Sequence, residues 1–347
     1  MRFADNRNKI GKYIPAVVFL IFIYGMALWF IFSPKPDYSS SEKRYLQKFP
    51  EVTAEKLLSG DFGSEFETFF ADRFPQRNTW VGLNAYTALA EGNNGASGVY
   101  NCKNGYLINK PVSTENNLDK NIGAVADFAK SIDTPTTVML VPSTGYIVDD
   151  VLPTFHDKYN DDEDISKISS TLSKDKIGFV DLRERFKSEY KNGSQLYYKT
   201  DHHWTTKGAY TGYQELCKAL GITPIDDSTL KKDSYPDFYG TTYSSSGFWL
   251  TPPDNIEIWN NPKNSDRNIS VKITEGANIK TSGSMYFTDH LKEDDKYPVF
   301  IDGNHALTEI TNTNAKNGTI LLIKDSFSHS LAPFLAENYS KVVLVDL

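Results

Sequence analysis

Two short segments of the chain carry side chains that could perform acyl transfer. Residues 197 to 210 read YYKTDHHWTTKGAY and include Asp201, His202 and His203, while residues 320 to 330 read ILLIKDSFSHS and include Ser326. In an extended segment, Asp201 and His203 would share one face and His202 would point away. A carboxylate bound to one imidazole nitrogen leaves the other free to act as a base toward a serine hydroxyl. The pattern predicts a catalytic unit in which Asp201 orients, His203 is the base and Ser326 is the nucleophile.

The position of Ser326 between an apolar run and a helix supports this prediction. Open α/β sheets place their sites at the ends of strands, and the amides and dipole of a helix N-terminus favour a developing oxyanion. Asn304, in the loop FIDGNHA (300 to 306), is a second expected oxyanion donor. Simpler alternatives stay open: Ser326 as a helix cap, Asp201 as a cap beside two surface histidines, and Asn304 as an ordinary turn residue.

The other histidines do not form a recognisable metal site. His156, His290 and His305 stand apart in polar loops, and we expect His329, one turn beyond Ser326, to be exposed to solvent. Adjacent histidines on an extended strand diverge and chelate one ion poorly. We therefore predict neither a metal nor a cofactor.

Short apolar runs alternate with amphipathic segments after about residue 99, which is typical of a mostly parallel α/β sheet. The predicted strands cover 136 to 142, 177 to 182, 319 to 323 and 341 to 347, with a helix between the last two. Thr205 and Thr206 are expected to begin another helix.

Residues 225 to 300 look like a long insertion of loops and short β pieces. Four of its aromatic residues could stack on sugar rings: Tyr239, Tyr243, Trp249 and Trp259. Because the chain ends within an expected central strand, we expect a longer natural protein.

Residues 13 to 32 form an uncharged run of twenty residues, long enough to cross a bilayer as a helix. Four basic residues and one acid precede it, which predicts a cytoplasmic N-terminus and an extracytoplasmic remainder: Arg2, Arg7, Lys9, Lys12 and Asp5. A cleaved signal peptide is the alternative. The expected organisation is a cytoplasmic tail (1–12), an anchor (13–33), a linker with membrane-proximal helices (34–91) and an α/β domain (92–347). In the helical stretch, five phenylalanines share a face that we expect to pack on the neighbouring domain: Phe62, Phe66, Phe69, Phe70 and Phe74.

The composition and net charge of the chain limit the classes of partner that it can bind. The chain holds 37 Lys and Arg against 44 Asp and Glu, a formal charge of −7, which argues against nucleic acid as a partner. Two cysteines, Cys102 and Cys217, permit at most one disulfide.

The segments TDHHW (200–204) and KDSFS (324–328) together resemble the DHHW family, which is similar to alginate O-acetyltransferase proteins of the SGNH hydrolase superfamily. The likeness continues through SEKRYLQKFP (41–50), FFADRFPQR (69–77), NGYLI (104–108), LVPSTGYIV (140–148), DFYGTTYS (237–244) and DGNHA (302–306). It implies a flavodoxin-like, SGNH-hydrolase-like parallel sheet with helices on both faces. It also implies an acid at Asp201, a base at His203 and a nucleophile at Ser326.

The resemblance further implies O-acetylation of a cell-surface exopolysaccharide, beside a membrane-bound O-acyltransferase that delivers acetyl groups. Three alternatives remain open. They are an acetylesterase of the same fold, a two-metal DHH-type phosphoesterase, which would need aspartate spacings absent upstream, and a non-catalytic polysaccharide-binding scaffold.

Overall fold

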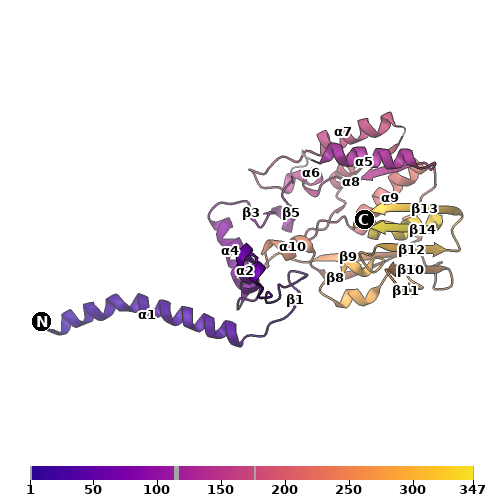
Figure 1. Cartoon of the computed structure of the whole chain (residues 1–347). Helices are drawn as coiled ribbons and strands as arrows, with labels where there is room; N and C mark the ends of the chain where they lie inside the picture. The colour runs from indigo at the N-terminus through magenta and orange to yellow at the C-terminus, as the bar shows by residue number, and fades with distance from the viewer. Residues whose placement is uncertain (1, 113–116, 176, 347) are drawn as a thin grey trace. The chain divides into compact units, whose positions relative to one another are not determined.

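The structure, a computed structural model, describes residues 2–112, 117–175 and 177–346 (Figure 1). The chain divides into two compact units, Met1–Asn84 and Ala85–Leu347. The first unit contains the apolar N-terminal helix, and the second contains Asp201, His203 and Ser326.

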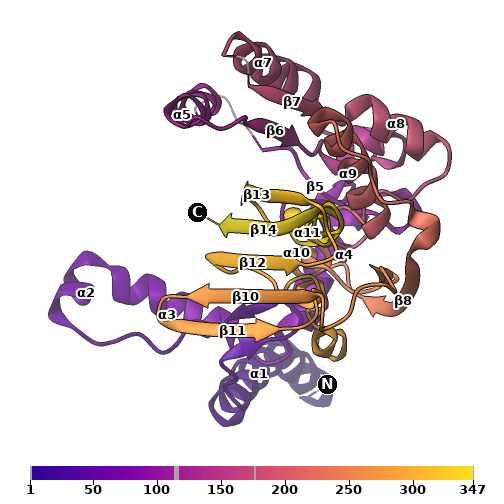
Figure 2. The same ribbon diagram turned by 90° about the vertical axis from the view of Figure 1, so that its right-hand side faces the viewer.

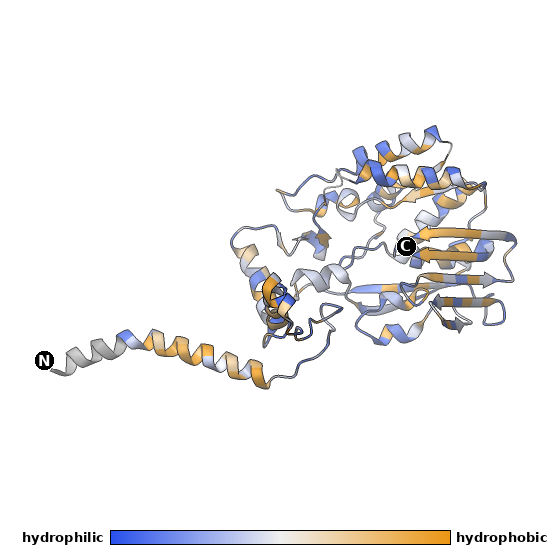
Figure 3. Ribbon diagram, in the orientation of Figure 1, coloured by the Kyte–Doolittle hydropathy of each residue, from blue (hydrophilic) through white to orange (hydrophobic). Residues whose placement is uncertain are grey.

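The first unit begins with α1 (Arg2–Phe32), whose portion Lys12–Phe32 is long and apolar enough to cross a membrane. Figure 3 shows this portion as an apolar run. It coincides closely with the predicted anchor. A short pairing and three helices follow: β1 (Tyr38–Ser39), β2 (Arg44–Tyr45), α2 (Ala54–Ser59), α3 (Asp61–Asp72) and α4 (Arg77–Ala90). The helical stretch predicted before residue 91 is thus confirmed.

The main sheet of the second unit has five strands in the order β11-β10-β12-β14-β13. Their bounds are β10 (Ile269–Glu275), β11 (Asn278–Ser282), β12 (Leu307–Asn312), β13 (Asn317–Lys324) and β14 (Tyr339–Asp346). β13 and β14 are parallel and are joined by α11 (Ser328–Asn338), which confirms the predicted strand, helix, strand unit. β14 is a central strand, as expected, because β12 and β13 pair with its two edges.

The prediction of a mostly parallel sheet is not confirmed for this layer, because β10, β11 and β12 pair antiparallel with their neighbours. β10 and β11 belong to the segment predicted to be a looped insertion, and they instead extend the sheet. This was missed because β10 joins the sheet by antiparallel pairing with β12, about forty residues away, and such pairing depends on contacts between distant segments.

The other two predicted strands form a second parallel pair. β6 (Thr137–Leu140) and β7 (Gly178–Asp181) run side by side in register, and Figure 2 shows them beyond β13, on the side away from β14. The helices of this part are α5 (Leu118–Ser131), α6 (Thr144–Ile147), α7 (Asp161–Lys174), α8 (Arg183–Lys191) and α9 (Thr206–Leu220). The second unit is therefore a mixed α/β fold built on small sheets.

Two smaller strand groups complete the second unit. β8 (Lys231–Phe238) and β9 (Asp254–Asn260) form an antiparallel ribbon, and α10 (Thr241–Ser246) lies between them in the sequence. β3 (Gly95–Ala96), β4 (Val99–Asn101) and β5 (Leu107–Asn109) form a short meander.

The main core lies around α9 and α11, which pack against each other, while α11 also packs on β14 and β12. It includes buried aromatic and aliphatic side chains of the two helices, of β14 and of the residues just before α9: Trp204, Tyr213, Phe334, Val342 and Leu344. Cys102 and Cys217 are both buried free thiols. This core fixes the start of α9 and the start of α11, the two points at which the predicted site residues lie.

Candidate active site

The aspartate and the two histidines lie in a tight turn. An antiparallel pairing of Tyr197 with Trp204 closes this turn. The buried carboxylate of Asp254 accepts hydrogen bonds from the backbone N–H groups of Lys199, at 3.0 Å, and Thr200, at 2.8 Å. These bonds satisfy backbone donors that a strand partner would otherwise satisfy. The expectation of an extended segment with alternating faces is therefore wrong for these residues.

Asp201 and His203 nevertheless come together, because one carboxylate oxygen of Asp201 contacts both the backbone N–H and the ring Nδ1 of His203. Asp201 Oδ1 accepts from the His203 backbone N–H at 2.8 Å and lies 2.5 Å from His203 Nδ1. Asp201 Oδ2 accepts from the backbone N–H of Thr241 at 2.6 Å and from its hydroxyl at 3.1 Å. Burial alone would raise the pKa of Asp201, but the attraction and hydrogen bond of His203 hold it well below its ordinary value. The carboxylate thus stays ionised and fixes the ring.

Ser326 completes a hydrogen-bonded line with this pair. Its Oγ lies 2.7 Å from His203 Nε2, although 123 residues separate the two in sequence. Ser326 sits between the end of β13 and Phe327, the residue that precedes α11, and its hydroxyl does not cap that helix. Asp325 accepts from the Phe327 backbone N–H at 3.0 Å instead. In this arrangement His203 can take the serine proton while Asp201 stabilises the resulting imidazolium.

Aromatic side chains hold the imidazole in its plane. The buried ring of Tyr297 stacks on His203, with centroids 3.9 Å apart and an interplanar angle of 10°. The Trp204 indole N–H donates to the Phe327 carbonyl at 3.0 Å and to Ser330 Oγ at 2.8 Å. Trp204 was visible in the sequence motif. Tyr297 was missed, because nothing in its local sequence marks it as a neighbour of His203.

His202 does not point away from the pair, which corrects the expectation drawn from alternation. Its ring centroid lies 3.9 Å from that of His203, and its Nδ1 is 2.7 Å from Thr241 Oγ1. Burial and the neighbouring His203 lower the pKa of His202 below its ordinary value. His202 therefore supports the same Thr241 that holds Asp201.

The side chains of Asp201, His202 and His203 lie near enough to one another to hold a metal ion. They fit one poorly, however, because both Asp201 oxygens and both His203 nitrogens already have hydrogen-bonding partners. A metal would have to displace Thr241 or Ser326 from these atoms.

Gly240 was also missed by sequence reasoning, and close packing explains why this position is glycine. A Cβ added at residue 240 would overlap the Asp201 side chain. Gly240 and Thr241 belong to the stretch DFYGTTYS, which carried part of the family resemblance but no assigned role. Their role here is to let the backbone approach the Asp201 carboxylate.

The expected oxyanion donor Asn304 is exposed and lies beside Lys324. Its Oδ1 accepts from Lys324 Nζ at 3.4 Å. The buried Lys324 ammonium also lies 2.6 Å from Asp346 Oδ2 and 2.9 Å from His329 Nε2. His329 is buried rather than exposed, because α11 presents it to the protein interior near Tyr297. Burial and then Lys324 lower the pKa of His329 to about 3, so the ring is neutral.

His290 and His305 are not isolated, contrary to the sequence-based expectation, because both bind Asp302. His290 Nε2 lies 2.9 Å from Asp302 Oδ1, and His305 Nε2 lies 3.0 Å from the Asp302 carbonyl oxygen. The second nitrogen of each ring contacts a glutamate, Glu293 for His290 and Glu275 for His305. His156 is exposed.

Three of the four aromatic residues proposed for sugar stacking pack on one another. Tyr239 and Tyr243 have ring centroids 4.3 Å apart, and Tyr243 lies 5.2 Å from Trp249; all three are half-buried. Trp259 is buried in the main core and is not available to a glycan.

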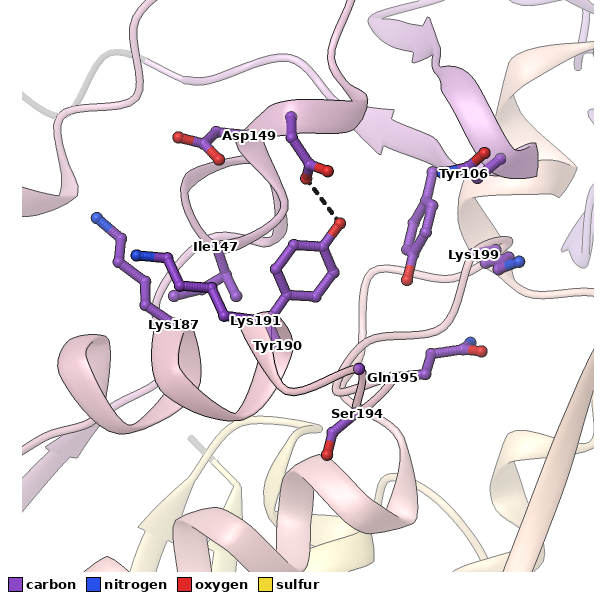
Figure 4. A pocket seen from close by; sticks show the side chains of 12 residues that line it. Tyr106, Ile147, Asp149, Lys187, Tyr190, Lys191, Ser194, Gln195 and Lys199 are labelled. Atoms are coloured by element: carbon purple, nitrogen blue, oxygen red, sulfur yellow. Dashed lines mark hydrogen bonds between the residues drawn. The ribbon is translucent and has the colours of Figure 1, made fainter.

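A hollow of about 950 Å³ lies apart from Ser326, and neither Ser326, His203 nor Asp201 lines it (Figure 4). In Figure 4 the hydroxyl of Tyr106 points toward this space, and Tyr190 bonds Asp150 at its edge. Lys199 also lines the hollow, two residues before Asp201. The hollow is polar, with lysine, aspartate and tyrosine side chains on its walls.

A family model described as DHHW protein matches residues 112–345, more than half of the chain. The chain belongs to the DHHW family. This finding confirms the resemblance drawn from TDHHW and KDSFS. No curated protein matches this DHHW chain.

Two solved structures share the fold of this DHHW protein at low identity, and a third is less similar. A DHHW family protein from Eubacterium siraeum DSM 15702 is 18% identical, with a TM-score of 0.59 over 72% of this chain and 83% of that chain. Bacillus cereus PatB1, solved with a sulfonyl adduct, is 19% identical, with a TM-score of 0.58 over 71% of this chain and 85% of that chain. The O-acetyltransferase domain of Pseudomonas putida AlgJ is 13% identical, with a TM-score of 0.44 over 70% and 78% of the two chains.

Proposed function

We propose that this DHHW protein is an extracytoplasmic serine O-acyltransferase that acetylates a cell-surface polysaccharide. One observation carries the proposal: the continuous line from Asp201 through His203 to Ser326, with contacts of 2.5 and 2.7 Å. An unassisted serine hydroxyl is a poor nucleophile, and a buried base held by a carboxylate is the usual means of activating it. Activation is therefore the simplest use of this geometry.

The proposed reaction has two halves that use the same atoms. Ser326 Oγ attacks the carbonyl carbon of an acyl donor while His203 Nε2 takes its proton, and the leaving group departs with that proton. A sugar hydroxyl then gives its proton to His203 and attacks the seryl ester. The bond from the acyl carbon to Ser326 Oγ breaks, and His203 returns the proton to Oγ, which restores both residues. Asp201 keeps the Nδ1 tautomer throughout and stabilises the transient imidazolium.

The oxyanion of each half-reaction needs donors near Ser326. We infer that backbone amides at the start of α11 supply them, because helix N-terminal N–H groups favour negative charge. The N–H groups of Phe327 and Ser328 donate to Asp325, and that of His329 donates to the Ser326 carbonyl, so an amide that binds the oxyanion must leave its present acceptor. Asn304 remains a proposed second donor. Its amide would have to turn from Lys324 toward the acyl oxygen.

One structural feature supports a glycan as acceptor. Tyr239, Tyr243 and Trp249 form a half-buried aromatic cluster on and beside α10, the helix whose first residue holds Asp201. Aromatic faces suit sugar rings, which are apolar on their C–H faces. We infer that the acceptor chain lies against this cluster as it enters the site.

One solved relative supports an activated nucleophile. PatB1 was solved with a sulfonyl adduct, and sulfonyl groups attach to activated nucleophiles. We propose that Ser326 is the corresponding nucleophile here. We also propose that β14, β13, β6 and β7 together form the flavodoxin-like, SGNH-type core implied by the family resemblance.

The proposed location follows from α1. Basic residues before the apolar run favour a cytoplasmic N-terminus, which would place the second unit outside the cytoplasm. A polysaccharide enzyme held beside the membrane needs an acetyl group delivered across it. We propose a membrane-bound O-acyltransferase as that donor.

The proposal is tested by deleting the gene and measuring ester-linked acetate on the surface polysaccharide. We expect a deletion strain to lose acetate, the wild-type gene to restore it and Ser326→Ala to fail. A His290→Ala gene, altered outside the site, should restore acetate as the wild type does. If deletion leaves acetylation unchanged and the purified protein releases acetate from no ester, the scaffold alternative replaces the enzyme.

The acetylesterase alternative is tested by measuring whether the acetyl group goes to a sugar or to water. Purified protein given an activated acetyl ester should pass acetyl groups to an added oligosaccharide in preference to water. Release of free acetate that added oligosaccharide does not reduce would favour the esterase. Hydrolysis of a phosphate ester that a chelator abolishes would instead favour a metal-dependent phosphoesterase.

A further inference from the structure

Large apolar side chains of the first unit remain exposed close to α1. α2 has no buried residue, and Leu58 at its C-terminal end is 90% exposed. Five other apolar residues of the same segment are also exposed. With Leu58 they are called the apolar surface of the first unit: Phe49, Val52, Leu57, Phe66 and Phe70. Exposed apolar groups that cluster in this way mark a contact surface.

Aromatic contacts order part of this surface. Phe49 packs edge-on against three rings of α3, with centroids 6.5 Å from Phe62, 6.1 Å from Phe66 and 5.4 Å from Phe69. Phe62 and Phe66 stack at 6.1 Å. The cluster therefore has a defined shape while Phe49, Phe66 and Phe70 still present apolar area outward.

A polar clamp ties α3 to the residues that leave α1. The buried Arg73 guanidinium donates to the Pro36 carbonyl at 2.5 Å and to Asp37 Oδ1 at 3.2 Å. Asp72 accepts from Arg44 at 2.5 Å and from the Gln47 backbone N–H at 2.9 Å. Charge-assisted bonds of this kind are stronger than neutral ones. The end of α3 is therefore held against the exit of α1.

With α1 across a bilayer, as proposed above, this clamp would place α3 at the level of the membrane surface. Pro36 follows Phe32 by four residues, so the clamp lies within about 14 Å of the last residue of the apolar run. Phe30, inside that run, contacts Phe69 and Phe70 directly, with centroids 6.3 and 4.7 Å apart. A residue that touches Phe30 lies at or beside the boundary of the hydrocarbon core, where aromatic side chains are enriched.

From these contacts we propose that the apolar surface of the first unit lies in the lipid headgroup layer of the bilayer that α1 crosses. α2 and α3 would then lie along the membrane, with Leu57, Leu58 and Phe66 against the acyl boundary, as interfacial amphipathic helices do. The occupant is lipid because the surface is continuous, through Phe30, with the helix inserted in the bilayer. The inference concerns the first unit and holds whether or not Ser326 is a nucleophile.

The test measures the depth of a spin label in the full chain in phospholipid bilayers. Both native cysteines are buried, so a nitroxide can be directed to Leu58→Cys. Ser64→Cys is the matched control, since Ser64 is exposed on α3 and residues two apart on a helix, such as Ser64 and Phe66, lie on nearly opposite sides. Collisions with oxygen, which concentrates in lipid, are compared with collisions with a water-soluble nickel chelate.

The expected result is a label at Leu58 that collides more with oxygen than with nickel and a label at Ser64 that shows the reverse order. Equal nickel access at both sites would mean that the surface faces water and would overturn the proposal. Protection of the Leu58 label from both reagents would also overturn it, because a protein partner would then cover the surface. Circular dichroism of each labelled chain checks that the helices are intact.

Discussion

Two clusters in the second unit pair histidine with aspartate, and only one of them reaches a hydroxyl. Asp201 and His203 are both almost fully buried, and the far nitrogen of His203 meets Ser326. His290, by contrast, is partly exposed and lies between two carboxylates, Asp302 on one nitrogen and Glu293 on the other.

The difference shows what an Asp–His pair needs before it can act as a base. Burial lowers the pKa of His290, but the hydrogen bonds to Asp302 and Glu293 outweigh it and raise that pKa above its ordinary value. A ring held protonated by two acids has no lone pair to offer. His203 has one carboxylate and one hydroxyl as partners, so its Nε2 remains available for a proton.

The largest difference in activity is expected between variants that lack Ser326 or His203 and a variant that lacks His290. Ser326→Ala or His203→Ala should lower acyl transfer by at least about 10³-fold, and the double variant should lose little more, because the residues act as a unit. His290→Ala should keep activity within about 2-fold. The measurement is the rate of acetyl release or transfer from an activated ester. Additive losses in the double variant would contradict the shared role.

Matched substitutions of Asp201 and Asp302 test the same difference between the two clusters. Asp201→Asn should keep the fold but favour the wrong imidazole tautomer, lowering kcat by roughly 10²- to 10⁴-fold. Asp302→Asn removes a partner of Lys280 and His290 and should lower the free energy of unfolding by about 1–3 kcal/mol without lowering kcat. Kinetics and denaturant titration of both variants test this. Equal kinetic losses would mean that the two clusters do not differ in role.

Gly240 tests whether the position of Asp201 matters. In Gly240→Ala the new methyl group would push the Asp201 carboxylate away, and a misplacement of about 1 Å can cost about 10²-fold in rate. Gly123→Ala is the control, since a Cβ at residue 123 of α5 meets nothing within 4 Å. Unchanged activity in Gly240→Ala would show that the carboxylate tolerates displacement.

Acidification is expected to change the stability contributed by His329 and the stability contributed by His290 in opposite directions. The pKa of the buried His329 falls from 6.5 to about 3, so the unfolded chain binds a proton that the folded chain refuses as pH falls below 6.5. Stability contributed by neutral His329 is therefore lost on acidification, by about 2 kcal/mol between pH 7 and pH 5. His290, with its raised pKa, adds stability at low pH and loses it as pH rises through the folded-state value.

Unfolding of the detergent-solubilised chain at pH 7 and pH 5 measures both effects. His329→Asn should reduce the acid-induced loss of stability, and His290→Asn should increase it. A change in the same direction for both variants would contradict the assignment of charge states.

The smallest effect is expected at His202. It supports Thr241 but makes no contact with the serine hydroxyl, so His202→Ala should lower kcat by less than about 10-fold, the scale of one lost neutral hydrogen bond. The matched His203→Ala variant gives the reference. A loss at His202 as large as that at His203 would make His202 part of the proton transfer.

The sequence predicted the parts of this site that local patterns encode. TDHHW and KDSFS contain all three residues of the line from Asp201 to Ser326, and Thr205 begins α9 as expected, accepting from the Gly208 N–H at 3.1 Å. Apolar runs located β6, β7, β13 and β14. Each of these signals lies within about ten consecutive residues.

The parts that sequence reasoning missed depend on contacts between distant segments. Tyr297 covers His203, Gly240 admits Asp201, and Asp254 shapes the turn, yet none has a distinctive local pattern. The burial of His329 depends on packing against Tyr297, which lies 32 residues earlier in the chain. The place of β10 in the sheet depends in the same way on pairing with β12, and β11 joins the sheet through β10.

The most direct test of the central claim is to trap the proposed intermediate. The purified chain is mixed with an activated acetyl ester, quenched in acid within one turnover, digested and mapped by mass spectrometry. The account predicts one added acetyl group on the peptide that contains Ser326, its loss on adding acceptor oligosaccharide, and none in His203→Ala. An acetyl group on another residue, or none on Ser326 while transfer proceeds, would contradict the account.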